Sequence, residues 1–537
     1  MKKLFRSHLL LLVYIFAVPL KAQATFPGPS IAHWDLSVSD ERNDADYSRI
    51  RKLVQEKKYD EAISILDGKS RKTPKESTPV ILKALVLNEK GDYQEALDML
   101  LESQKIEMRH PAAHFSFCQI YRNLGVRELS KRACYIAVEQ HPNAPESHYE
   151  LAQTLAAYGN MPTANAELFI AADLDPKNPV YFYERGMNYY YLNQYDESEK
   201  AFLKALSLDE NHIDSLYQLA YLYAARKKPD LAKLRIIKIL ETRREDPNYN
   251  SAKLLLEFIE KGNMDKLPLK IIPHEYHVGR AKNLYQSGKY GLALIEIQTA
   301  AELKPEDIKI NEILIGLSSM LMRLDITEKA VSSMLQHSKD NNMLKARGYQ
   351  ELGDIRLIQG RLTEAKEFLN KALGLRDPDG LAKISLKEFP DEKAQPFPYN
   401  KNQHFFKPTD ALNHKGEIFA FYKMYERAIA IYSMVIRMDP NHLLSLLNTA
   451  TAYYNSGNHA RTVSILERLL VTHPNHEFVL AHRLLLAKAY VKSDDLSGSL
   501  KHLELAVKMN PSIKSKIKTD PVFEPLKTTA AFKILVE

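Results

Sequence analysis

A 34-residue period is the feature of this sequence that most constrains its fold. Three units follow one another without a gap, at 111–144, 145–178 and 179–212. Glycine or asparagine stands at the fifteenth position of each unit (Gly125, Gly159 and Asn193), and alanine stands at the twenty-seventh (Ala137, Ala171 and Ala205). Glycine and asparagine tolerate the left-handed backbone that ends a helix, and alanine lets two helices approach closely. Each unit is therefore predicted to form a helical hairpin.

Large and small residues hold fixed positions within these units. The eighth position is small (Cys118, Ala152 and Gly186), and the eleventh is large (Tyr121, Leu155 and Tyr189). Side chains of unequal size at fixed positions interdigitate between neighbouring helices. Pro142 and Pro176 close the first two units, where proline ends a helix because it lacks an amide donor.

This pattern resembles that of the tetratricopeptide repeat (TPR) family, in both its period and its small, aromatic and proline positions. The resemblance covers most of the chain. It implies an all-α fold, a right-handed superhelical solenoid of about 11–12 helix-turn-helix repeats with a C-terminal capping segment.

Breaks in the period divide the chain into two arrays. Pro268 and Pro273 flank an apolar run between them, and a second irregular stretch rich in proline and aromatic residues interrupts the later array. The predicted organisation is a signal peptide at 1–24, an extended lead-in at 25–42, a first array at 43–262, a junction at 263–273, a second array at 274–376 and 409–511, an irregular insertion at 377–408, and a cap at 512–537. The insertion is either a functional arm or a segment packed on neighbouring repeats.

The first 24 residues have the pattern of a secretory signal peptide. Lys2, Lys3 and Arg6 precede an apolar run at 9–20, and Ala24 ends a stretch of small residues suited to cleavage. The alternative is a short uncleaved anchor, although twelve apolar residues fall short of a bilayer. We expect cleavage near Ala24 and a periplasmic or secreted protein with no stable membrane span after signal removal.

The charge of the chain does not favour a nucleic-acid partner. The formal net charge is +7, but four of the cations lie in the leader, which has no acidic residue, so the mature chain carries +3. A balance of that size over more than 500 residues, without a dense lysine or arginine block, does not indicate polyanion binding.

Cys118 and Cys134 are the two cysteines of the chain, and both belong to one unit. They stand at its eighth and twenty-fourth positions, which face each other across a hairpin. In an oxidising compartment they could form a disulfide. The alternative is a pair of buried thiols that act as small apolar side chains.

A row of aromatic residues marks the predicted inner surface of the first array. The fifth position, which in TPR proteins usually belongs to the concave surface, holds aromatic residues one period apart (Phe115, Tyr149, Tyr183 and Tyr217). Further inner positions extend the predicted ligand-binding set (Tyr190, Tyr221, Gln119, Arg122 and Gln153). Tyrosine combines a large apolar face with one hydroxyl, so this row suits an extended peptide or a sugar chain. The alternative is that the rings only fill space between adjacent first helices.

No pattern in the sequence predicts catalysis, a metal site or a cofactor. His274 and His277 are three residues apart, whereas the zinc protease motif requires four, and no glycine-rich phosphate loop is found. We expect a non-catalytic exported scaffold that binds another protein or a peptide through a concave aromatic groove. The alternative is a structural component of a cell-envelope assembly, such as polysaccharide export or secretion, with glycan binding.

Overall fold

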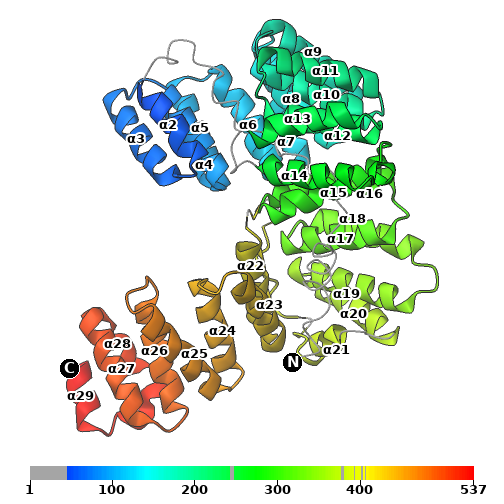
Figure 1. Cartoon of the computed structure of the whole chain (residues 1–537). Coiled ribbons are helices and arrows are strands. Elements are labelled where there is room, and N and C mark those ends of the chain that lie inside the picture. Colours follow the sequence, from blue (N-terminus) through cyan, green and yellow to red (C-terminus); the bar gives the residue numbers. More distant parts are fainter. Residues whose placement is uncertain (1–44, 242–246, 376–379, 392, 401–402, 406) are drawn as a thin grey trace. The chain divides into compact units, whose positions relative to one another are not determined.

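The computed structural model describes residues 45–241, 247–375, 380–391, 393–400, 403–405 and 407–537 (Figure 1). Every regular element in these ranges is a helix, and the all-α fold of repeated helical hairpins predicted from the sequence is confirmed. The signal peptide and the lead-in predicted before Asn43 lie outside the described residues. No helix in the described ranges has the length and apolar character needed to cross a membrane.

The described chain separates into two compact units, with the division between Leu314 and Ile315. Helices that belong to the first unit are α2 (Ala45–Gln55), α3 (Tyr59–Lys72), α4 (Thr78–Lys90), α5 (Tyr93–Ile106), α6 (Pro111–Asn123), α7 (Arg127–Gln140), α8 (Pro145–Ala157), α9 (Met161–Leu174), α10 (Pro179–Tyr191), α11 (Tyr195–Leu208), α12 (Ile213–Ala225), α13 (Pro229–Leu240), α14 (Pro247–Glu260), η2 (Met264–Lys266), α15 (Pro273–Gln286) and α16 (Tyr290–Leu303). The division falls inside α17 (Ile308–Met320), so the predicted junction at 263–273 lies within the first unit.

The hairpins begin and end at the residues that the sequence pattern predicts. Prolines open α6, α8 and α10, where the missing amide of proline costs no helical hydrogen bond. The turns that follow pass through left-handed backbone at the fifteenth position, with φ of 72° at Gly125, 78° at Gly159 and 60° at Asn193. The small eighth position is needed for packing, because a Cβ atom on Gly186 would lie 2.5 Å from the Phe202 ring.

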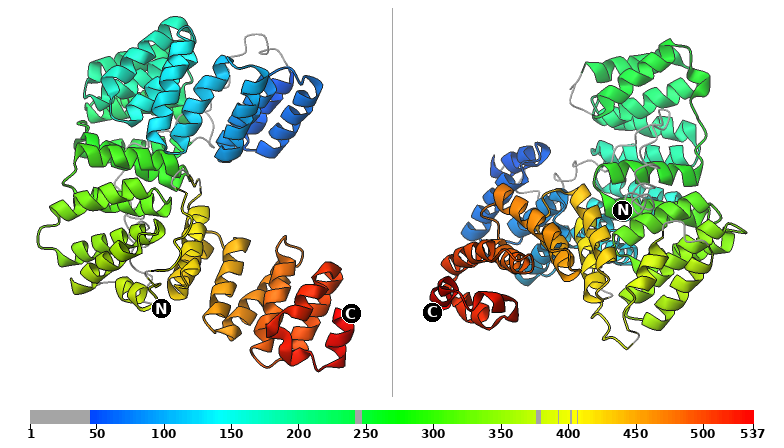
Figure 2. Two further views of the ribbon diagram at one scale, coloured as in Figure 1. Left: turned by 180° about the vertical axis from the view of Figure 1, so that it is seen from behind. Right: turned by 90° about the horizontal axis from the view of Figure 1, so that it is seen from below.

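The second unit is also built from stacked hairpins (Figure 2). Its helices after α17 are α18 (Leu324–His337), α19 (Asn342–Ile358), α20 (Leu362–Gly374), α21 (Leu381–Lys387), α22 (Pro408–Phe421), α23 (Tyr425–Met438), α24 (Leu443–Asn455), α25 (His459–Thr472), α26 (Val479–Val491) and α27 (Leu496–Met509). The predicted cap contains η3 (Pro511–Ile513), α28 (Lys514–Thr519), η4 (Pro521–Leu526) and α29 (Ala530–Val536). Phe523 and Phe532 of the cap are buried in a cluster with Leu503 of α27.

The predicted irregular insertion contains one short helix, α21, and its described part packs on the following hairpin. The Phe397 ring lies 5.3 Å from the Phe421 ring and 5.6 Å from the His414 ring. The backbone amide of Phe397 donates a hydrogen bond of 2.8 Å to the Tyr422 hydroxyl. These contacts agree with the alternative in which the insertion packs on neighbouring repeats. Phe406, another aromatic of this stretch, lies outside the described residues.

Candidate peptide-binding site

The aromatic row of the first array is buried. The exposed fractions of its side chains are 7% for Phe115, 1% for Tyr149, 6% for Tyr183 and 5% for Tyr217. The Tyr149 ring packs 5.6 Å from the ring of Tyr181. Burial raises the pKa of the Tyr217 hydroxyl to about 12. The row therefore does not line an open groove in this structure, and its role in contacting a ligand stays a prediction.

The physical reason is that neighbouring helices cover these rings, and Leu267, beyond α14, joins the buried cluster of Tyr183 and Tyr217. Tyr183, for example, lies 5.8 Å from the ring of Phe202 and 5.4 Å from that of His212. Tyr190 and Tyr221 are likewise buried, with exposed fractions of 3% and 4%. Aromatic side chains at one position of successive hairpins can thus act as spacers between first helices.

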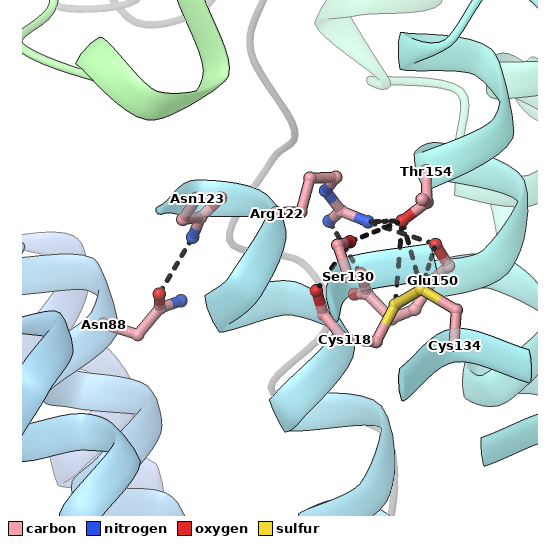
Figure 3. Close-up of polar contacts among 8 residues, drawn as sticks. All are labelled: Asn88, Cys118, Arg122, Asn123, Ser130, Cys134, Glu150 and Thr154. Carbon is pink, nitrogen blue, oxygen red and sulfur yellow. Dashed lines mark hydrogen bonds and ion pairs between the residues drawn. A yellow bond between two sulfur atoms is a disulfide. The ribbon is translucent and has the colours of Figure 1, made fainter. Parts of the chain in front are cut away.

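Arg122 is also turned inward, where it forms a buried ion pair with Glu150. One guanidinium nitrogen lies 2.6 Å from Glu150 Oε2, and the other donates to the Glu150 carbonyl oxygen at 3.1 Å and to the Thr154 hydroxyl at 3.2 Å (Figure 3). Burial raises the pKa of Glu150, and the charge of Arg122 acts in the opposite direction. Of the two predicted glutamines, both partly buried, Gln153 hydrogen-bonds Glu184. The donors of Arg122 are therefore used within the chain.

Cys118 and Cys134 form a disulfide beside this ion pair (Figure 3). Their Cα atoms are 4.8 Å apart, and the bond joins α6 to α7 within one hairpin. The Ser130 hydroxyl donates to the Cys118 carbonyl oxygen at 3.2 Å, and the Thr154 hydroxyl lies 3.2 Å from Cys134 Sγ. Of the two alternatives that the sequence left open, the structure has the disulfide.

The predicted junction lies against the inner side of the first array as an extended segment, residues 267–272. Asn193 holds it in both directions: the Ile271 amide donates to Asn193 Oδ1 at 2.7 Å, and Asn193 Nδ2 donates to the Ile271 carbonyl oxygen at 3.3 Å. The Tyr195 hydroxyl donates to the Leu269 carbonyl oxygen at 3.0 Å, and the Tyr221 hydroxyl to that of Pro268 at 3.2 Å. Three side chains from the stretch between α10 and α12 thus bind the main chain of this segment.

Apolar side chains of the segment add packing to these hydrogen bonds. Leu267 is buried, with 8% of its surface exposed, and Leu269 and Ile271 pack against the core of α10 to α14. Ile271 also contacts the cluster that joins Met161 and Tyr191 to Tyr276. The first array therefore holds this extended segment of its own chain through main-chain hydrogen bonds and through alternate apolar residues.

The hairpin α15–α16 follows the segment and packs on α6 and α8. The Thr299 hydroxyl donates to the Ala157 carbonyl oxygen at 2.8 Å. Gly291 approaches the turn after α6 so closely that a Cβ atom there would lie 2.1 Å from the Asn123 carbonyl oxygen. The predicted second array thus begins with a hairpin that belongs, by its contacts, to the first unit.

A buried polar cluster fixes α15 against α10 and α16. The Tyr276 ring lies 4.9 Å from the Tyr191 ring. Glu296 accepts from Arg280 Nε at 2.8 Å, and its other oxygen is 2.6 Å from His277 Nδ1. Burial opposes ionisation of Glu296, but Arg280 and His277 outweigh it and lower its pKa. His277, one of the two histidines weighed as metal ligands, is therefore paired with a carboxylate inside the fold.

Sequence reasoning predicted Tyr221 as an inner-surface residue but missed Asn193 and Tyr195. A signal was present, because Asn193 stands where the two preceding units have glycine. Asparagine tolerates left-handed backbone and also carries an amide that can pair with a peptide group. Asparagine at this position keeps the left-handed turn and adds hydrogen bonds to Ile271.

The helical hairpins define a helical-repeat protein. Three stretches match family models for the tetratricopeptide repeat, at residues 179–212, 346–379 and 444–476. Together with the fold, these matches identify the chain as a member of the TPR family. The comparison with curated proteins gave no match.

Parts of this chain are similar to several solved structures. TTC0263, a thermophilic TPR protein of Thermus thermophilus, has 22% identity, covers 33% of this chain and 99% of its own, and gives a TM-score of 0.30. YrrB, described as a TPR protein with an unusual peptide-binding site, has 16% identity, covers 36% and 97%, and gives 0.28. PilF of Pseudomonas aeruginosa has 12% identity, covers 41% and 96%, and gives 0.32.

Proposed function

We propose that this chain is an exported, non-catalytic scaffold that binds an extended segment of a partner protein on the inner side of its first array. TPR proteins are generally protein-interaction scaffolds without catalysis, and this family membership supports the coarser statement. The observation that carries the finer one is the way Asn193, Tyr195 and Tyr221 hold residues 267–272.

The chemistry of the bound segment indicates the class of ligand. Its hydrogen bonds are made by main-chain groups, which every peptide has, while Leu269 and Ile271 supply alternate apolar contacts. Pro268 lacks an amide donor and contributes its carbonyl oxygen alone. A partner segment of this kind is extended, contains proline and has apolar residues at every second position.

The chain's own segment competes with such a partner. A segment joined by a short linker is present at an effective concentration in the millimolar range. A partner in trans therefore binds weakly while residues 267–272 occupy the site. Its apparent affinity equals its intrinsic affinity multiplied by the fraction of time for which the site is vacant.

Export is supported by two independent features. The leader at 1–24 has the signal-peptide pattern, and the Cys118–Cys134 disulfide is typical of an oxidising compartment. A periplasmic or secreted location agrees with both.

A binding assay on a vacated site tests the proposal. Residues 267–272 are replaced by a glycine-serine linker of equal length, and binding of a fluorescent peptide with the sequence of residues 265–273 is followed by polarisation. The vacated chain should bind the peptide, and the added Asn193→Gly change should weaken binding by about fivefold or more. Unchanged helicity with no peptide binding would refute the proposed site.

A further inference from the structure

One polar group of the peptide site is left over by the chain's own segment. The Tyr190 side chain is 3% exposed, and its hydroxyl has no hydrogen-bond partner among the described residues. Two other tyrosine hydroxyls of the site are used, by Tyr195 on the Leu269 carbonyl oxygen and by Tyr221 on that of Pro268. A buried polar group without a partner has lost its hydration and gained nothing in return, so such groups are rare and indicate a missing ligand or water.

The Tyr190 hydroxyl belongs to the part of the site that residues 267–272 occupy. Tyr190 shares a buried cluster with Tyr221 and Leu267. Its ring lies 5.9 Å from the Tyr195 ring, and its hydroxyl interacts electrostatically with those of Tyr221 and Tyr195. The segment therefore offers this part of the site the side chain of Leu267, which cannot accept a hydrogen bond.

The surroundings of this hydroxyl indicate which acceptor would suit it. Burial raises the pKa of Tyr190 well above its ordinary value, so the hydroxyl stays protonated and can donate. The titratable groups that act on it are the hydroxyls of Tyr221, Tyr195 and Tyr217, and burial raises their pKa values too, so they are uncharged at neutral pH. A carboxylate would lose its hydration beside uncharged groups, whereas a neutral amide loses much less. The amide oxygen of glutamine or asparagine is the acceptor that fits.

We infer that the partner segment carries glutamine or asparagine where the chain's own segment has Leu267, and that Tyr190 selects it by donating a hydrogen bond to the side-chain oxygen. The inference rests on the proposed function, because it names a residue of the segment bound at the same site. It also accounts for displacement of residues 267–272. A partner that satisfies Tyr190 makes a hydrogen bond that the competing segment lacks, and this difference favours the partner.

A double-mutant cycle isolates this hydrogen bond from the loss of apolar burial that replacing leucine causes. The full chain with the glycine-serine linker at 267–272, with and without Tyr190→Phe, is titrated with the peptide of residues 265–273 and with its Leu267→Gln and Leu267→Asn forms. Tyr190→Phe removes the hydroxyl and keeps the ring. It should weaken binding of at least one amide-bearing peptide by about fivefold or more, and it should not weaken binding of the native peptide.

Tyr221→Phe is the matched control, because the Tyr221 hydroxyl contacts the main chain of the segment. It should weaken binding of all three peptides by a similar factor. A second readout uses the chain with its own segment in place. There Tyr190→Phe should not speed hydrogen exchange of the Ile271 amide, whereas Tyr221→Phe should.

The outcomes separate this inference from the proposed function. A native peptide that does not bind the chain with the linker would refute the proposed function, and the inference with it. A native peptide that binds, together with an effect of Tyr190→Phe that is equal for all three peptides or absent, would leave the peptide site standing. It would overturn the inference, since water alone would then satisfy the hydroxyl.

Discussion

Asn193→Gly removes the hydrogen bonds that Asn193 makes to the segment 267–272 and keeps the backbone conformation of the turn. Asn193 has φ of 60°, and glycine already serves at this position with φ of 72° in Gly125 and 78° in Gly159. The change therefore keeps the turn between α10 and α11. It removes both bonds to Ile271 and one of the two acceptors that share the single Tyr195 hydroxyl hydrogen, Asn193 Oδ1 at 2.7 Å, and leaves the other, the Leu269 carbonyl oxygen at 3.0 Å.

The expected loss in docking free energy of residues 267–272 follows from the number of hydrogen bonds removed. An intramolecular hydrogen bond contributes about 0.5–1.5 kcal/mol net, so the two bonds to Ile271 stabilise the docked segment by about 1–3 kcal/mol. That range corresponds to roughly a 5- to 150-fold change in the equilibrium between docked and undocked segment. The packing of Leu267 and Leu269 remains, so α15 and α16 should keep their helical structure.

Hydrogen exchange measures this equilibrium directly. The Ile271 amide, which donates to Asn193 Oδ1, should exchange faster in Asn193→Gly by at least this factor, while the amides of α12 stay protected. Lys57→Gly is the matched control, because Lys57 is exposed and has φ of 59° at the fifteenth position of an earlier hairpin. Equal exchange of the Ile271 amide in wild type and Asn193→Gly would refute the reasoning.

Four further outcomes are expected. Replacing both cysteines by alanine should destabilise the first unit by about 3 kcal/mol in chemical denaturation, and reductant should have the same effect on the wild type. Gly291→Ala should destabilise α16 by about 1–3 kcal/mol in thermal melts, because its Cβ atom would meet the Asn123 carbonyl oxygen at 2.1 Å, whereas Gly374→Ala, with nothing within 4 Å, should be tolerated. Burial, and then His476, lower the pKa of His482 from 6.5 to about 4. Since the unfolded chain takes up this proton first, stability should fall by up to about 3 kcal/mol between pH 6.5 and 4, and His482→Gln should remove that slope in melts. N-terminal sequencing of the protein exported by a bacterial host should begin after Ala24, and an intact leader on the mature protein would contradict export by cleavage.

The fold could be predicted because each hairpin repeats the same local requirements. Left-handed turns, small contact positions and opening prolines depend on neighbours within about one period, and Gly159, Gly186 and Pro145 carry them in the sequence itself. What could not be predicted was the course of the chain where the period breaks. Leu269 and Ile271 contact residues far earlier in the chain, with separations of 74 for Tyr195 and 78 for Asn193, and no local pattern encodes such a contact.

The candidate site could be predicted only in part, because it too depends on contacts between distant parts of the chain. The family resemblance assigned fifth-position aromatics such as Tyr149 to an inner surface, but exposure depends on what the rest of the chain places against that surface. Residues 267–272 and α15 cover the inner side of α10 and α12, and this is a tertiary property. The disulfide could be proposed because its two positions face each other within one hairpin.

A repeat array contains its own controls, and these separate packing residues from functional ones. Aromatic residues recur at the fifth position of four successive hairpins and are buried, so their recurrence reports packing within the first array. Asn193 departs from glycine at a turn whose backbone is unchanged, and its amide binds another segment. Because every hairpin must satisfy the same packing, a departure that leaves the hairpin intact indicates contact with something outside that hairpin, which for Asn193 is a distant segment of the chain.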